Sequence, residues 1–238
     1  MRQGKLAIAP ISATIGLVGA LVFWAYALPV AAQTANADFQ ALLQDTQRMI
    51  QEASGTTMVW WMPDDYWRVT LAQTPGVTKE DLDKFVESLS PYTIIVAVHA
   101  KVSPMGAVTY ESEADLRASI RLTDNRGSSY SPLPDEKISE DARKNLDEIR
   151  PSFGQMAGPM GQNMHIFVFP GTYKLGGRIA DPRKDGGFNV KLGEKEFRWR
   201  LPLGSLMPPK VCPKCNEKLS GAFKFCPYDG AQLPATEE

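Results

Sequence analysis

The 238-residue sequence has few of the side chains that most often carry catalysis or bind metals, with only three cysteines and two histidines. It lacks a G-x-S-x-G nucleophile turn, an H-E-x-x-H zinc motif and a glycine-rich phosphate loop. Hydrolases and nucleotide-using enzymes therefore find little support in the sequence. An excess of positive charge is also absent, because 26 Lys and Arg stand against 27 Asp and Glu. No basic face is implied, and we expect no nucleic-acid partner.

The beginning of the chain lacks charge. After Arg2 and Lys5, no charged residue occurs before Asp38, and most of that stretch is apolar. A positive start, an apolar run and small residues at its end are typical of an export signal. The run is longer than the ~7–15 residues of such signals and approaches the ~20 that span a bilayer. Residues 1–37 are therefore predicted to be a cleaved signal peptide or an uncleaved membrane anchor, with the body outside the cytoplasm.

The tail holds all three cysteines, in Cys212-Pro213-Lys214-Cys215 and Cys226-Pro227-Tyr228-Asp229-Gly230. Zn²⁺ prefers four ligands in a tetrahedron, and a C-x-x-C turn places two sulfurs on one side of a loop. A second turn facing the first completes such a site, and here its last ligand is a carboxylate. The spacing predicts a metal site formed by Cys212, Cys215, Cys226 and Asp229.

This tail resembles the short zinc ribbons of many bacterial proteins, whose pattern is CPxCG followed by FCPxCG. Phe225, Cys226, Pro227 and Gly230 match that pattern, while Asn216 replaces its first glycine and Asp229 its fourth cysteine. The resemblance implies a small ribbon over residues 210–234 with a structural zinc ion. Two alternatives remain open: a ribbon without metal, and a redox pair formed by Cys212 and Cys215.

An odd number of cysteines is unusual in an exported protein, where thiols commonly form disulfides. Zinc would account for them by occupying the thiolates. The alternative is that the body stays in the cytoplasm.

Residues 38–90 have a mainly helical pattern. Phe39, Leu42, Met49 and Ile50 recur at helical spacing, and Thr78 precedes acidic residues and an apolar stripe, as at a helix start. Within this portion, residues 56–61 are prone to form a strand.

Residues 91–207 have the alternation of strands. Strands are predicted at 92–102, 107–110, 116–122 and 164–169, the last of them central, and a helix at 139–153 followed by a loop at 154–161. The best-specified pair is a hairpin with Gly193-Glu194 at its turn. One register places Val190 opposite Phe197, Phe188 opposite Trp199 and Lys191 opposite Glu196.

These elements predict an α+β fold: an antiparallel β-sandwich with helical additions at its N-terminal side and the small ribbon after it. The segment 120–132 resembles a hairpin of the immunoglobulin-like domains of bacterial surface proteins, which implies an immunoglobulin-like sandwich.

The two histidines, the methionines before His165 and the aromatic cluster at 60–67 can each be explained as structural residues as well as functional ones. His165 shares a strand face with Phe167 and Phe169, and His99 lies toward the polar face of its strand. Three methionines before His165 suit Cu(I) in principle, although glycines and a proline interrupt them. The aromatic cluster at 60–67 is expected in the core rather than exposed for sugar or partner binding.

The function expected from these observations is a non-enzymatic binding or assembly module of the cell envelope, periplasmic or at the cell surface, with a protein partner and a structural zinc ribbon. It would contact the membrane through residues 1–37 if that segment is not cleaved. The alternative is an envelope enzyme whose site is assembled around His165.

Overall fold

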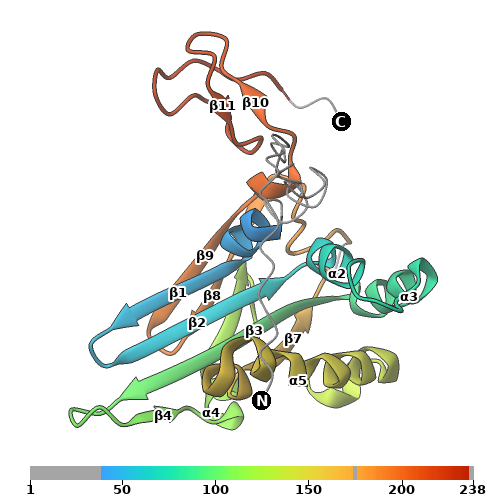
Figure 1. The fold of residues 1–238 in the computed structure, drawn as a ribbon, viewed down its shortest axis with the longest axis vertical. Helices are drawn as coiled ribbons and strands as arrows, with labels where there is room; N and C mark the ends of the chain where they lie inside the picture. Colours follow the sequence, from blue (N-terminus) through green and yellow to red (C-terminus); the bar gives the residue numbers. More distant parts are fainter. Residues whose placement is uncertain (1–38, 174–175, 236–238) are drawn as a thin grey trace, which may run out of the picture.

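The computed structural model describes residues 39–173 and 176–235 (Figure 1). The predicted signal or anchor, residues 1–37, lies outside the described residues. Among the residues that are described, no helix is both long and apolar enough to cross a membrane.

The first sheet has five antiparallel strands in an open arrangement. β3 is its centre, with β2 and then β1 on one side and both β7 and β4 on the other. β7 pairs with the first half of β3 and β4 with its last residues. The strands are β1 Gln47–Glu52, β2 Gly55–Met62, β3 Tyr92–Val102, β4 Val108–Tyr110 and β7 His165–Pro170.

The second sheet has four antiparallel strands in the order β6-β5-β8-β9 and is also open. Its hairpin confirms the predicted register, with Val190 opposite Phe197, Phe188 opposite Trp199 and Lys191 opposite Glu196. The apolar pairs are buried while the charged pair is exposed, so one register satisfies both faces of the strands. The strands are β5 Ile120–Asp124, β6 Ser129–Tyr130, β8 Gly186–Leu192 and β9 Lys195–Leu201.

The helices occupy the connections between strands. Thr78 caps α3 as predicted, because its side chain accepts a hydrogen bond from the Asp81 N–H and the Asp81 carboxylate accepts one in return. Besides a first helix over residues 39–46, the α-helices are α2 Asp64–Leu71, α3 Lys79–Leu89, α4 Glu113–Ser119 and α5 Glu140–Gln162. Short 3-10 turns follow at Asp135–Lys137 and Gly204–Leu206, and the tail contains β10 Lys210–Val211 and β11 Lys218–Leu219.

Two adjacent tryptophans of β2 face opposite layers, because successive side chains of a strand point to opposite faces. Trp60 packs edge-on against Tyr66 of α2, with ring centroids 5.1 Å apart. Trp61 packs edge-on against Phe188 of β8 at 5.0 Å. Helices therefore cover one face of the first sheet, and the second sheet contacts the other. The aromatic cluster is buried, which confirms its assignment to the core.

The N-terminal portion is less helical than predicted. The first helix ends at Thr46, and Met49 and Ile50 lie in β1 instead of continuing it. β1 pairs with β2, and β2 pairs with β3 in the strand-rich part of the chain. The nearly fully buried β2 needs hydrogen-bonding neighbours on both sides, and this requirement outweighs the helical spacing of the apolar residues at 39–50.

The strand predicted at 116–122 is wrong over its first half, which forms α4. Ser112 caps this helix by accepting a hydrogen bond from the Asp115 N–H. The Ser-x-x-Asp pattern at 112–115 is a helix-start signal that the alternation of apolar residues concealed. The strand begins only at Ile120.

Two predictions around α5 are also corrected. The expected loop at 154–161 is helical, apart from a kink where Ala157 and Gly158 leave helical geometry and Gly158 adopts a φ of 54°. β7 is not a central strand, because among the described residues it pairs with β3 alone. On its other side a single N–H, from Leu133, donates to the Val168 carbonyl.

Candidate metal centre

The tail contains two turns with matching backbone geometry. The Asn216 N–H donates to the Cys212 carbonyl and the Gly230 N–H to the Cys226 carbonyl, both at 3.0 Å. Asn216 and Gly230 have φ values of 60° and 71°, so each closes its turn in the left-handed region. Asparagine tolerates that region better than most residues, which explains how Asn216 replaces the usual glycine.

The two turns are tied into short β-pairs in the same way. The Cys212 N–H donates to the Glu217 carbonyl at 2.9 Å, and the Cys226 N–H donates to the Ala231 carbonyl at 2.8 Å. β10 and β11 flank the first turn, and a bridge between Phe225 and Gln232 flanks the second. The repeated geometry makes the turns near-equivalent halves of one site.

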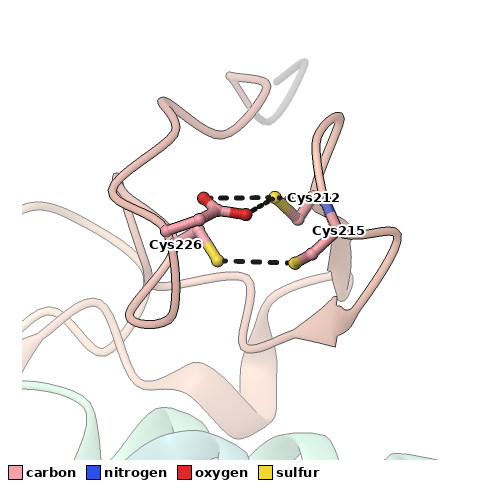
Figure 2. Close-up of side chains that lie close together, drawn as sticks. Cys212, Cys215 and Cys226 are labelled. Atoms are coloured by element: carbon pink, nitrogen blue, oxygen red, sulfur yellow. Dashed lines mark hydrogen bonds between the residues drawn. The ribbon is translucent and has the colours of Figure 1, made fainter.

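The four predicted ligands converge between these turns, and Figure 2 shows the three cysteine sulfurs pointing into the same space. One ligand atom from each of Cys212, Cys215, Cys226 and Asp229 lies within 4.8 Å of all the others. Cys215 Sγ is 3.7 Å from Cys226 Sγ, and Cys212 Sγ is 3.4 Å from Asp229 Oδ2. The four residues lie close enough to hold a metal ion.

Backbone N–H groups donate hydrogen bonds to Cys212 and Asp229 and favour the anionic forms of these side chains. N–H groups of Cys215 and Lys214 point at Cys212 Sγ, and they lower the pKa of the Cys212 thiol. The Ala231 N–H donates to Asp229 Oδ1 at 2.8 Å and lowers the pKa of that carboxyl. At Cys215 an N–H from Glu217 favours the thiolate, but partial desolvation and hydrogen bonding to Cys212, Asp229 and Cys226 outweigh it and raise the pKa to about 12.

No disulfide joins the three thiols of the tail, and the redox pair of Cys212 and Cys215 stays an alternative. All three cysteines are free, Cys212 and Cys226 are buried, and Cys215 is exposed. The Cys215–Cys226 separation of 3.7 Å far exceeds the ~2.05 Å of a disulfide. The buried side chains of the tail form a cluster of their own, apart from the main core: Cys212, Leu219, Cys226 and Leu233.

His165 lies in a charged cluster that the sequence did not indicate. Its Nδ1 is 3.5 Å from Glu113 Oε2, and the same carboxylate contacts Arg117 and Arg150. Burial lowers the pKa of His165 and outweighs the negative charge of Glu113, which raises it, while the positive charge of Arg150 adds to the lowering. The cluster joins β7, α4 and α5, which are distant in sequence, so no local motif pointed to it. In the described part of the chain, no hydroxyl or thiol is hydrogen-bonded to His165.

The remaining candidates have structural roles. His99 is half-buried, and its Nδ1 contacts Glu111 Oε2 at 2.7 Å between β3 and β4. Of the methionines considered for copper, Met156 is exposed whereas Met164 is buried in the main core. Neither histidine belongs to the group of potential metal ligands found among the described residues.

Comparisons with protein-family models, with curated proteins and with solved structures found no match to this chain. The chemistry of the site is therefore argued from its own geometry.

Proposed function

We propose that the protein is a non-enzymatic binding or assembly module outside the cytoplasm, and that its tail is a structural zinc ribbon. The observation that carries the proposal is the convergence of Cys212, Cys215, Cys226 and Asp229. The body would be a β-sandwich with helical additions. The contact between Trp61 and Phe188 across the two sheets supports the sandwich, and the 120–132 hairpin is the feature that suggests an immunoglobulin-like one.

The distances support zinc as the metal. Two thiolates bound to Zn²⁺ at about 2.3 Å lie about 3.8 Å apart at a tetrahedral angle, against 3.7 Å between Cys215 and Cys226. A thiolate and a carboxylate oxygen at about 2.0 Å from the same ion lie about 3.5 Å apart, against 3.4 Å between Cys212 and Asp229. Three sulfur ligands also favour zinc over magnesium or calcium.

A structural role follows from the number of ligands. Catalytic zinc sites keep one position open for water or substrate, whereas four protein ligands close the shell. Asp229 supplies the fourth ligand while its other oxygen is held by the Ala231 N–H. Such a second contact orients the ligand and fixes its geometry.

The zinc proposal is tested by metal analysis of the full chain purified under reducing conditions. We expect one zinc per chain, and none in Cys226→Ser. Replacement of the half-buried Ser220, which is not a ligand, by Ala is the matched control and should leave the zinc content unchanged. A zinc-free wild-type protein that keeps the same ribbon fold would contradict the proposal.

The location outside the cytoplasm rests on the uncharged apolar stretch that follows Arg2 and Lys5. A reporter active only after export, fused behind Glu238, should be active in cells. Replacing the apolar stretch by a polar one should abolish that activity. Activity of a cytoplasm-dependent reporter at the same position would overturn the proposed location and favour a cytoplasmic body.

One observation favours the alternative of an envelope enzyme, namely the contact of His165 with Glu113. A carboxylate that orients a histidine is part of many hydrolytic sites. Covalent labelling of the full chain by a fluorophosphonate probe, lost in His165→Gln, would establish such a site. Absence of labelling is the result expected for a binding module.

A further inference from the structure

A groove of about 950 Å³ lies between the ribbon and the second sheet. Figure 1 shows the ribbon, with β10 and β11, standing beyond the end of β9 and near the first helix. One wall of the groove comes from β1 and β9 and the other from the ribbon segment before Cys226. The groove does not include the metal ligands, so it is a separate feature of the surface.

The sheet wall of the groove is basic. Arg198 and Arg200 project from the exposed face of β9, two residues apart, which separates their positions by about 7 Å. Arg198 Nε donates to the Asn189 side chain, and Arg200 has no hydrogen bond or ion pair with any described residue. Arg48 lies beside them, held over the Trp199 ring and by backbone carbonyls. The terminal nitrogens of Arg198 and Arg200 remain available to an acceptor.

The carboxylates that line the groove already have partners. Asp185 pairs at 2.8 Å with Lys224, which also lines the groove. Asp45 accepts a hydrogen bond from the Ser205 N–H, also at 2.8 Å. Neither makes an ion pair with Arg198 or Arg200, so the basic wall is not neutralised by the part of the chain that the structure describes.

The ribbon wall is aromatic. Phe223 and Phe225 line the groove, two residues apart, with 44% and 60% of their surface exposed. Large exposed apolar side chains beside a hollow mark interaction sites more often than ordinary surface. The two walls thus present paired arginines and paired phenylalanines.

We propose that this groove binds an extended segment of a partner protein in which acidic residues alternate with apolar ones. In an extended chain, every second side chain points the same way, about 7 Å apart. Carboxylates at alternate positions then match Arg198 and Arg200, with bidentate pairing available to each guanidinium. The apolar side chains between them face the aromatic wall.

A groove suits a segment of polypeptide better than a flat lipid surface, which cannot enter a hollow. The balance of 26 basic against 27 acidic residues in the whole chain disfavours nucleic acid. The inference names the partner chemistry of the binding module proposed above and therefore rests on that proposal.

The test measures binding of the full chain to a fluorescent peptide in which glutamate alternates with leucine. Its controls are a peptide with lysine in place of glutamate and one of the same composition with the glutamates in a single block. We expect the alternating peptide to bind best. Arg198→Glu and Arg200→Glu should each weaken binding by at least about tenfold, the lower end of the value of one charged hydrogen-bonded contact.

A matched control reverses two exposed charges outside the groove, with Arg143→Glu and Lys144→Glu in α5. This variant should bind the alternating peptide like the unaltered chain. Phe225→Ala should weaken binding without changing the zinc content. Equal binding of the blocked peptide, equal weakening by the α5 reversals, or binding only to vesicles of anionic lipid would overturn the inference. Zinc content and export are measured on the same variants, so failure of the groove is distinguishable from failure of the proposed function.

Discussion

Removal of the metal should unfold the ribbon and leave the body folded. The ribbon buries few apolar side chains, because only Leu219 and Leu233 join the two cysteines in its buried cluster. Each leucine contributes about 1.5–3 kcal/mol on burial. Ordering the backbone costs about 1–2 kcal/mol for every residue, so these two side chains cannot hold the ribbon together without the ion.

The free energy by which the bound ion stabilises the ribbon follows from mass action. At a free metal concentration about 1,000 times the dissociation constant, the ion stabilises the ordered ribbon by about 4 kcal/mol. Hydrogen exchange should therefore accelerate up to about 1,000-fold on chelation at amides that the turns protect. The N–H groups of Cys212 and Cys226 are the reporters, because each donates to a carbonyl within the ribbon.

The body supplies an internal control. Trp60, Trp61, Trp67 and Trp199 are all buried in the main core, and no tryptophan lies in the ribbon. Chelation should leave tryptophan emission and the exchange of the Val190 amide unchanged. Unchanged protection in the ribbon after proven loss of the metal would refute the reasoning, and so would a red shift of the tryptophan emission.

Four further predictions concern single side chains. Asp229→Cys should tighten zinc binding in a competition titration with a chromogenic chelator, because it restores four thiolates; weaker binding would show that the carboxylate is the preferred ligand here. Phe188→Ala should lower the free energy of unfolding by about 3–5 kcal/mol, since Phe188 is buried against Trp61 and Trp199. Phe225→Ala, at an exposed site, should change that free energy by less than about 0.5 kcal/mol in the same denaturant titration. Asp124 is buried, and hydrogen bonds from the Ser128 N–H, the Tyr130 hydroxyl and the Arg126 N–H outweigh the desolvation that opposes them, so its pKa is lowered. The ionised carboxylate therefore stabilises the fold above the unfolded pKa of about 4, and this stabilisation is lost as the pH falls through the lower pKa of the folded state. In urea titrations, the free energy of unfolding of Asp124→Asn should fall less with decreasing pH than that of the unaltered chain.

Local sequence patterns predicted the structure correctly where the interacting residues lie close together along the chain. The β8–β9 hairpin was predictable in register because its apolar pairs, its charged pair and its turn all agree on the same alignment. The convergence of Cys212, Cys215, Cys226 and Asp229 was predictable for the same reason, since all four lie in one short stretch of the tail, residues 212–229. The cap of α3 by Thr78 is likewise local.

Patterns that depend on distant segments were not predictable. The apolar spacing of residues 39–50 suits a helix, yet β1 forms because β2 requires a neighbour. The alternation at 116–122 suits a strand, yet the Ser112 cap starts a helix there. The cluster of His165, Glu113 and Arg150 unites three elements that no sequence motif connects.

The order of residues along the tail was enough to predict its two turns and the side chains that converge between them, because left-handed backbone positions and C-x-x-C spacing are properties of a few consecutive residues. The groove beside the ribbon required the folded molecule. Arg198, Arg200 and Phe225 line the same groove only because the ribbon packs beside the end of the second sheet. Contacts between segments far apart in the chain depend on how whole layers pack, and that packing is a property of the assembled core rather than of any short stretch of sequence.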